Sequence, residues 1–362
     1  MTRFTSKLLC VIVIGTCHTT LLLAQNPDSS NVAFGGFIDT YFAYDFDKPA
    51  QRDRGYTTQP ARHNEFNINL AFVEARLAGE RMRGRLALQT GTSVNFNYAA
   101  EVNNRELAQL IQEAVAGFRV TDGLWIDAGI YLSHIGLESW ISRDNWTYTR
   151  SLCSEYSPYY QSGVKATWQT SQRLAVQFHV LNGWQNLAET NNGKALGLQA
   201  AFTPSEKFSL TYNNFFGNEQ SDSLASRTRF FNDIVLKFAL NPSAQIAGVF
   251  DLGLEEKPSG SGNSTWYTAL LLGRFEATSS LAFTGRIEYF SDKDQVIVKT
   301  GTPGGFQTFG ASLTADVKVA PGMLWRAEVR MFNSKNHIFP TNNATAFSRD
   351  NAFIVSSITL SF

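Results

Sequence analysis

The residues best placed to do chemistry are charged side chains that recur at every second position of short segments. Arg81, Arg83 and Arg85 form the clearest ladder, and Arg326, Glu328 and Arg330 repeat the spacing. In an extended strand, residues two apart lie on one face, so such a ladder would project its charges together. Charges gathered on one wet surface create a local field that orients polar solutes and draws counter-ions. The candidate water-facing charges are Arg81, Arg83, Arg85, Lys165, Asp251, Arg274, Glu276, Arg286, Glu288, Asp316, Lys318, Arg326, Glu328 and Arg330.

Catalytic and metal chemistry have little support in the sequence. A hydrolase needs a nucleophile beside a base, and His134 near Ser133 and Ser139 is the best such pairing. His179 alternates with Ala175, Gln177 and Leu181, as expected of a wall position. No glycine-rich phosphate loop and no metal-spaced His/Asp cluster occurs in the sequence, so we expect no catalytic residues, metal or cofactor.

The composition narrows the class of protein. Among 362 residues, 31 basic side chains balance 31 acidic ones, and charged residues make up only 17%. A balanced charge argues against a nucleic-acid binder, which needs a basic face. Beyond residue 24 no apolar run approaches the roughly 18 residues of a transmembrane helix. The aromatic content of 13% argues against disorder and favours β structure.

Residues 1–24 have the pattern of an export signal. Arg3 and Lys7 form a positive start, an apolar run follows, and small Ala24 offers a cleavage site. Removal of this segment would leave 29 basic and 31 acidic residues, and Cys153 as the last cysteine. A single cysteine forms no internal disulfide and no thiolate cluster. We expect residues 25–32 to form a short periplasmic segment before a domain at 33–362.

Alternation of apolar and polar residues runs through the whole mature chain. A period of two is the signal of a half-buried strand, whereas a helix would mix the two sets. Many of these runs reach the roughly 9–11 residues that a tilted strand needs to cross a bilayer. Alternation is poor in the first run and changes phase near Phe72-Val73 in the second. The sixteen predicted strands are 33–44, 64–79, 81–96, 113–121, 123–132, 161–170, 173–183, 194–203, 206–217, 227–240, 243–254, 264–278, 281–291, 306–319, 324–334 and 350–362.

The connections alternate between tight turns and long loops. Seven are tight, and eight longer ones separate them. In an antiparallel up-and-down barrel this places every short turn on one side, as in outer-membrane barrels with short periplasmic turns. The last strand ends on Phe362, which resembles the terminal assembly signal of such barrels. Aromatic clusters at strand ends, such as Phe215-Phe216 and Phe230-Phe231, would form girdles at the membrane boundary.

A barrel of about 16 strands encloses an aqueous lumen that wall side chains cannot fill. Charges of both signs would line it, which predicts weak ion selectivity. The loop at 134–160 is the best candidate for a constriction because loops beyond about 15 residues are usually functional. An external loop folded on itself is the alternative. Leucines at helical spacing predict a short helix within 104–114. The candidate constriction charges are Glu138, Arg143, Asp144, Arg150 and Glu155.

Several motifs resemble the β-barrel porin-2, OmpL-like family of Gram-negative outer membranes. They include residues 37–45, the run Gln59-Pro60-Ala61-Arg62-His63-Asn64-Glu65-Phe66-Asn67 and residues 133–139, with Asn182-Gly183-Trp184 further on. The resemblance covers about residues 33–200 and implies a porin for passive diffusion of ions and small hydrophilic solutes.

Two other interpretations stay open at this stage. One is a barrel with a plugged lumen that acts as a structural or adhesive surface protein, and the other is an outer-membrane hydrolase. The expected partners are the lipid bilayer, the outer-membrane assembly machinery and small solutes, with no nucleic acid. A homotrimer is compatible with this interpretation, although no patch in the sequence requires one. For the arginine ladder, cross-strand pairing with Glu74, Asp127 or Asp39 is an alternative to a free positive field.

Overall fold

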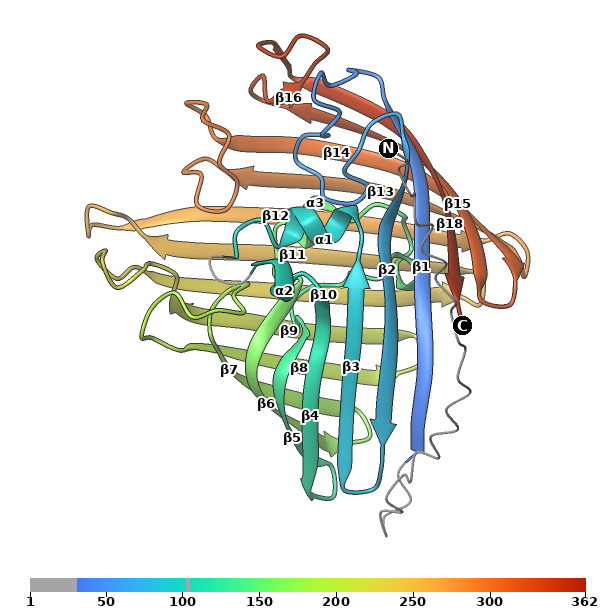
Figure 1. Cartoon of the computed structure of the whole chain (residues 1–362), viewed down its shortest axis with the longest axis vertical. Helices are drawn as coiled ribbons and strands as arrows, with labels where there is room; N and C mark the ends of the chain where they lie inside the picture. The colour runs from blue at the N-terminus through green and yellow to red at the C-terminus, as the bar shows by residue number, and fades with distance from the viewer. Residues whose placement is uncertain (1–30, 102–104) are drawn as a thin grey trace, which may run out of the picture.

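The computed structural model describes residues 31–101 and 105–362. The predicted signal peptide at 1–24, and positions 25–30 of the predicted periplasmic segment, lie outside the described residues. Each strand pairs antiparallel with its neighbours, and β1 pairs with β18 to close the sheet into a barrel (Figure 1). The prediction of one closed antiparallel barrel of sixteen strands is therefore confirmed.

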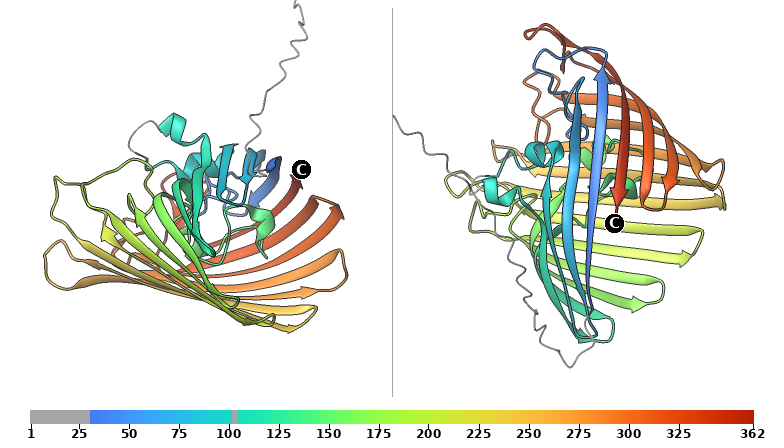
Figure 2. Two further views of the ribbon diagram at one scale, coloured as in Figure 1. Left: turned by 90° about the horizontal axis from the view of Figure 1, so that it is seen from below. Right: turned by 45° about the vertical axis from the view of Figure 1, so that its right-hand side comes forward.

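The barrel strands follow one another in chain order around the wall, and a small hairpin of β16 (Phe339–Pro340) and β17 (Phe347–Ser348) decorates the last long loop. The two further views show how strongly the strands tilt around the wall (Figure 2). The barrel strands are β1 (Asn31–Asp45), β2 (Phe66–Ala78), β3 (Met82–Thr90), β4 (Ile111–Thr121), β5 (Leu124–Leu132), β6 (Tyr160–Ser171), β7 (Leu174–Leu181), β8 (Ala195–Ser205), β9 (Phe208–Asn218), β10 (Thr228–Asn241), β11 (Ala244–Glu256), β12 (Asn263–Glu276), β13 (Leu281–Asp292), β14 (Phe306–Ala320), β15 (Met323–Ser334) and β18 (Asp350–Ser361).

The two-residue alternation gives each strand an apolar outer face. On β12, Leu271 and Phe275 are about half exposed, whereas Leu270 and Leu272, on either side of Leu271, are buried. Direct partners across the sheet share a face, so Ile287 on β13, opposite Leu271, is also exposed. Every wall strand except β5 carries at least one large exposed apolar side chain, and such a belt is costly in water and stabilising in lipid.

The outer belt predicts a depth-dependent cost for charge. Leu271→Arg would place a guanidinium near the middle of the lipid-facing surface, where such a charge costs about 2–4 kcal/mol. Thr265 lies on the same face of β12 near its loop end, where Thr265→Arg should cost about 0–1 kcal/mol. Urea unfolding from phospholipid vesicles measures both. Equal costs at the two positions would contradict the placement of this face in lipid.

The predicted strand at 81–96 is too long. β3 ends at Thr90, and residues Thr92–Asn97 form the helix α1, which buries Val94. Gly91 joins the two with a φ of 139°, and a Cβ there would overlap the Asn69 carbonyl. The prediction failed because polar and apolar residues also alternate through the short helix, so pattern alone did not reveal the break at Gly91.

The predicted helix within 104–114 is also wrong beyond Ala108. α2 covers only Arg105–Ala108, and β4 begins at Ile111. Leu107 and Leu110 are exposed, so the leucine stripe does not pack on the barrel. Among residues 31–101 and 105–362, no helix is long and apolar enough to cross a membrane.

The phase change predicted in the second strand is present, but it lies earlier. Asn69 and Leu70 on β2 both point inward, where the register with β1 shifts between Asp39 and Thr40. Such a bulge puts two residues opposite one and swaps the faces beyond it.

The predicted aromatic girdles are only half right. Phe216 and Phe230 face outward and are partly exposed, whereas Phe215 and Phe231 are buried inside the barrel. Neighbours in a strand must face opposite sides, so a pair of adjacent rings can contribute only one to the membrane boundary. The inward rings pack on Trp184 and Trp266 instead.

Candidate functional site in the barrel interior

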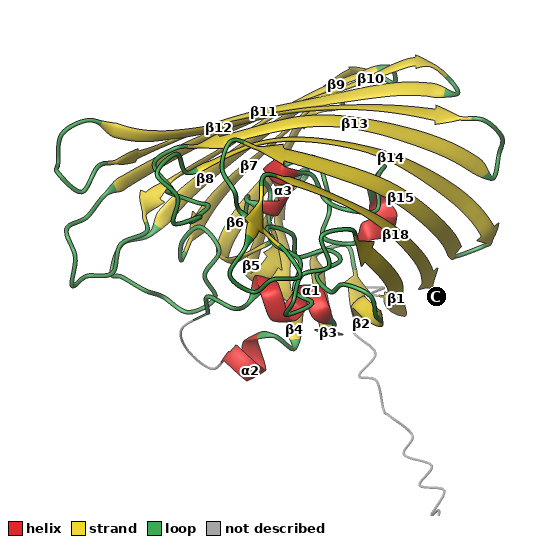
Figure 3. Ribbon diagram, turned by 90° about the horizontal axis from the view of Figure 1, so that it is seen from above, coloured by secondary structure: helices red, strands yellow, loops and turns green. Residues whose placement is uncertain are grey.

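The connection between β5 and β6 folds into the barrel. We call residues 133–159 the infolded segment; it carries the 3-10 turn η1 (Ser142–Asp144) and the helix α3 (Leu152–Glu155). Seen from above, α3 and its flanking loops lie within the ring of strands (Figure 3). Cys153, with Leu137 and Trp146, packs on an apolar patch of the wall formed by Val235, Ala247, Val249, Leu270 and Leu272.

A buried carboxylate on β15 holds the middle of this segment. Glu328 is 1% exposed. Its Oε2 accepts the backbone N–H groups of Tyr148 at 2.8 Å and Thr149 at 2.9 Å, while Oε1 accepts the Thr149 hydroxyl at 2.5 Å. Arg286 of β13 lies 2.8 Å from the same carboxylate and donates to the Thr149 carbonyl at 2.7 Å. The wall therefore supplies both charges and the segment supplies backbone groups between them.

A second arginine extends this contact along β15. Arg330 donates to the Arg150 carbonyl at 2.7 Å, and its other end lies 2.5 Å from Glu288, which accepts the Leu152 N–H at 2.5 Å. A Cβ at Gly310 would crowd the Glu288 carboxylate, so this glycine gives Glu288 its room. Hydrogen bonds to charged groups contribute about 1.5–3 kcal/mol each, more than neutral ones.

Nearer the short turns, a third arginine binds the start of the segment. Arg326 donates to the Asn145 carbonyl at 2.6 Å and pairs with Asp316 at 3.0 Å. Arg274 donates to the other oxygen of Asp316 at 2.7 Å. We call Arg286, Glu288, Asp316, Arg326, Glu328 and Arg330 the wall clamp.

Two strands further round the wall from β15, β1 holds the segment through one acid. Asp39 of β1 accepts the Ser142 hydroxyl at 2.8 Å, the Tyr148 hydroxyl at 3.1 Å and the Asn69 amide at 2.8 Å. At the other end of the segment, the Gly136 N–H donates to Asp233 of β10 at 2.8 Å. Because β10 lies seven strands from β1 in the closed ring of sixteen, the segment crosses the lumen rather than lying against one wall.

A second long loop, at 46–65, packs over the first. The Thr58 N–H donates to the Glu155 carboxylate, and the Tyr159 hydroxyl donates to the other Glu155 oxygen at 2.9 Å. Burial raises the pKa of the Glu155 carboxyl above its ordinary value. Arg54 fixes the base of this loop by donating to the Pro60 carbonyl at 2.6 Å and pairing with Asp45 at 3.3 Å.

His134 is engaged by groups other than serine. Its Nδ1 lies 2.9 Å from the Gln161 amide oxygen and its Nε2 lies 3.0 Å from the Asn214 carbonyl. The imidazole stacks on His179 with ring centres 4.1 Å apart, and burial lowers the pKa of His134. The Ser133 hydroxyl instead accepts the Ile135 N–H at 3.1 Å. A serine–histidine pair is therefore not formed among the described residues.

The arginine ladder of β3 is paired across strands. Arg83 donates to Asp127 at 2.6 Å, and Arg85 lies between Glu74, at 2.5 Å, and Glu113. These contacts match the cross-strand alternative considered from the sequence. Arg81 is exposed at the turn before β3.

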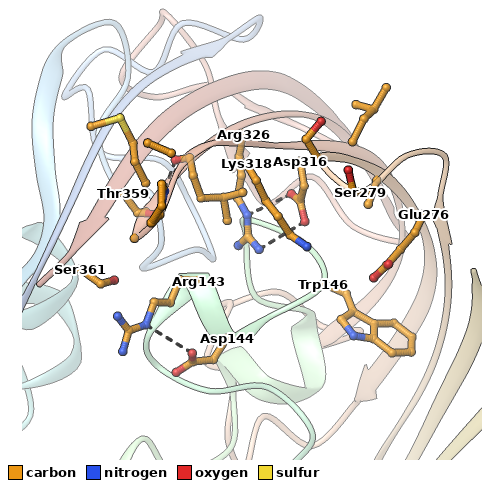
Figure 4. Close-up of a pocket in the computed structure, with 18 of the residues that line it drawn as sticks. Arg143, Asp144, Trp146, Glu276, Ser279, Asp316, Lys318, Arg326, Thr359 and Ser361 are labelled. Atoms are coloured by element: carbon orange, nitrogen blue, oxygen red, sulfur yellow. Dashed lines mark hydrogen bonds and ion pairs between the residues drawn. The ribbon is translucent and has the colours of Figure 1, made fainter. Parts of the chain in front are cut away.

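A cavity of about 720 Å³ opens beneath the infolded segment (Figure 4). Its wall includes the short turns around residues 278–281 and 320–324, so it faces the short-turn end of the barrel. Arg143, Asp144 and Trp146 of the segment lie on one side of it, and Lys318 and Glu276 on the other. The lining carries both signs of charge and one indole.

The other predicted site residues divide by burial. Asp251 is buried opposite Asp233 on the neighbouring strand. Asp233 was not predicted as a site residue, yet it accepts the Gly136 N–H at 2.8 Å. Lys165 is partly exposed, with its ammonium 4.4 Å from the Tyr131 ring. Within the segment Glu138, Arg150 and Glu155 are buried, whereas Arg143 and Asp144 reach the cavity. Phe362 closes the barrel: its carbonyl accepts the Gly36 N–H at 2.9 Å.

Asp39, Ser142 and Tyr148 were also missed as site residues. Asp39 had a signal in the sequence, because it is an acid on the same face as Phe37 and Tyr41. Ser142 and Tyr148 had none, since their partner lies more than 100 positions away in the chain.

A closed sixteen-stranded barrel with an apolar outside, charges inside and a loop folded into its lumen defines the class of outer-membrane channels. The chain belongs to the family described as "Putative beta-barrel porin-2, OmpL-like", whose model matches residues 31–362. It is an outer-membrane porin.

Solved structures show the same fold at low sequence identity. An anion-selective porin from Comamonas acidovorans matches with a TM-score of 0.61 and 10% identity, covering 92% of this chain and 100% of that one. OmpT of Vibrio cholerae in its trimer form matches with a TM-score of 0.62 and 11% identity, covering 92% of this chain and 100% of that one. The outer membrane channel DcaP of Acinetobacter baumannii matches with a TM-score of 0.60 and 9% identity, covering 92% of this chain and 97% of that one. No curated protein matches this chain.

Proposed function

We propose that this porin passes ions and small hydrophilic solutes passively, and that the infolded segment sets the size limit. The observation that carries the proposal is the attachment of the segment both to β1, through Asp39, and to β10, through Asp233. These two strands lie seven places apart in the ring of sixteen, nearly opposite each other, so the segment narrows the lumen over most of its width. It also stays in place when solutes pass, because its anchors are buried charges.

The same geometry supports a weak preference of the channel between anions and cations. The wall clamp neutralises its own charges, with Arg286, Arg326 and Arg330 facing Glu288, Asp316 and Glu328. The side chains left to meet solutes are those at the cavity rim, such as Arg143, Lys318 and Glu276, which carry both signs. We infer mild selectivity from this mixture rather than a strong preference for anions or cations.

Catalysis is not part of the proposed function. Both nitrogens of His134 face amide or carbonyl oxygens, so this imidazole is not poised to take a proton from Ser133 or Ser139. The absence of a nucleophile–base pair at this position supports a channel rather than a hydrolase.

Export and assembly follow from the class. We propose that cleavage near Ala24 releases the mature chain into the periplasm, that residues 25–30 remain there, and that the C-terminal Phe362 serves assembly into the outer membrane. OmpT of Vibrio cholerae, which shares the fold, has been solved as a trimer, which supports a homotrimer here. Chemical cross-linking in native membranes tests this, and a monomer alone would contradict it.

Planar-bilayer recording tests the proposed channel directly. Purified protein should insert in discrete current steps, with a reversal potential close to zero in a salt gradient of equally mobile ions. Liposome swelling should then slow as solute size increases. A barrel plugged by its buried segment, acting as a surface protein, would give no current above baseline, and that result would remove the channel proposal.

A further inference from the structure

Arg150 of the infolded segment is a buried cation without a partner. The residue is 2% exposed, yet its Nε and Nη1 atoms have no hydrogen-bond partner among residues 31–101 and 105–362. The guanidinium carbon lies 3.8 Å from the centre of the Tyr159 ring. A ring stacked on a guanidinium covers one face of it, while the five N–H donors lie in the plane and stay available.

The carboxylates nearby are already engaged. Glu138 accepts the backbone N–H and the hydroxyl of Ser151 at 2.8 and 2.5 Å. Glu155 accepts from the Thr58 N–H and the Tyr159 hydroxyl. Neither acid forms an ion pair with Arg150 in the described structure, in contrast to Arg286 and Arg330, which each contact a glutamate directly. Glu155 is near enough to interact with Arg150 through charge, but it does not reach the Nε and Nη1 donors. Buried donors without an acceptor are unfavourable, so these two call for an acceptor from outside the chain.

A cavity is present where that anion would bind. Arg150 lines a space of about 220 Å³ enclosed by residues 132–140 on one side and Pro158 and Tyr159 on the other. Arg150 and Glu138 are the charged residues in its lining. Glu138 Oε2 accepts from Ser151, and its Oε1 faces Thr147 and Arg286. One water occupies roughly 30 Å³ in the liquid, so there is room for a small anion and several waters.

We propose that the infolded segment holds a small monovalent anion, chloride or a carboxylate group, in the plane of the Arg150 guanidinium. This site lies apart from the cavity of Figure 4 and does not depend on whether the channel conducts. The anion would accept hydrogen bonds from the Arg150 guanidinium and fix it against Tyr159. Chloride from the medium and the carboxylate of a permeating solute share this chemistry.

Tryptophan fluorescence offers one test because Trp140 lines the cavity. The folded protein in detergent micelles is titrated with sodium chloride or sodium acetate, replacing sodium isethionate, a salt without a carboxylate, at constant ionic strength. We expect a saturable change in emission. Arg150→Gln should weaken binding of the anion about tenfold or more, which corresponds to about 1.4 kcal/mol of binding free energy. The matched control Arg143→Gln changes an arginine of the same segment that lines the other cavity, and should leave the titration unchanged.

The two anions separate the sources of the ligand: saturation by chloride alone indicates an inorganic ion, and saturation by acetate indicates a solute carboxylate. Bromide soaked into crystals of the unaltered protein provides a second measurement that does not depend on folding of a variant. An anomalous peak beside Arg150 would support the site. An empty cavity in that map, or identical titrations for the unaltered protein and Arg150→Gln, would overturn the proposal.

Discussion

Glu328→Ala is expected to destabilise the barrel by about 3–5 kcal/mol, the cost of removing one partner of a buried ion pair. The substitution leaves Arg286 without its 2.8 Å partner and leaves the N–H groups of Tyr148 and Thr149 without an acceptor inside the lumen. We also expect the infolded segment to loosen, so that single-channel current becomes larger and noisier. Urea unfolding from vesicles and bilayer recording measure the two effects on the same preparation.

Two further variants make this result specific. Glu328→Gln keeps one carbonyl acceptor of the same size but loses the charge, so its cost should fall between that of the alanine variant and zero. Glu276→Gln changes a rim acid on β12 whose contact with Arg274 is long, at 3.9 Å. Its cost should stay within about 0.5 kcal/mol. Equal stability for the alanine variant and the Glu276→Gln control would show that the wall clamp does not hold the segment.

Deletion of residues 138–156 is expected to raise conductance severalfold. The deletion removes Ser142, Tyr148 and Thr149, the residues through which Asp39 and Glu328 hold the segment in the lumen. It also uncovers the wall clamp, whose three arginines face three acids. Because that set is neutral, the current should increase for both ions and the reversal potential should change little.

A control deletion belongs beside it. Removal of residues 221–226, in the connection between β9 and β10, shortens a long loop in which residues 222–226 are exposed. We expect nearly unchanged conductance from that variant. Unaltered conductance after deletion of 138–156 would show that the infolded segment lies outside the conducting path, and the size limit would then need another origin.

The arginines of β3 have an inward face that the sequence predicts and pairing partners that it does not. Alternation along β3 places Arg83 and Arg85 on the inward face, as expected. Whether they form a free positive field or cross-strand pairs was open, because the answer depends on the acids that the register brings beside them. Asp127 and Glu113 come from β5 and β4, and the bulge between Ala87 and Leu88 helps set which residues face each other. Reversing the charges of Arg83 and Arg85 would place carboxylates beside Asp127 and Glu113. Such variants would therefore disturb the wall and would not report on the ion selectivity of the channel.

The same limit applies at Gly91 and Ser142. The left-handed backbone at Gly91 ends β3 early, yet the alternation continues through α1 without a break. Ser142 sits in a loop with no periodic pattern, so nothing in its neighbourhood predicted its hydrogen bond to Asp39. By contrast Glu328 and Arg330 stood out early as inward charges on a strand, because their neighbours supply the opposite face.

The amino-acid sequence by itself determined the pattern of the barrel wall: sixteen strands, an apolar outside, charges inside, and turns that alternate between short and long. These properties are local, since each residue's face follows from the residues beside it. The tertiary structure decided which inward charges meet, and that the connection after β5 folds inward to meet them. Thr149 and Glu328 are 179 positions apart. Their contact depends on the register of every intervening strand and on closure of the barrel, which no short stretch of sequence encodes.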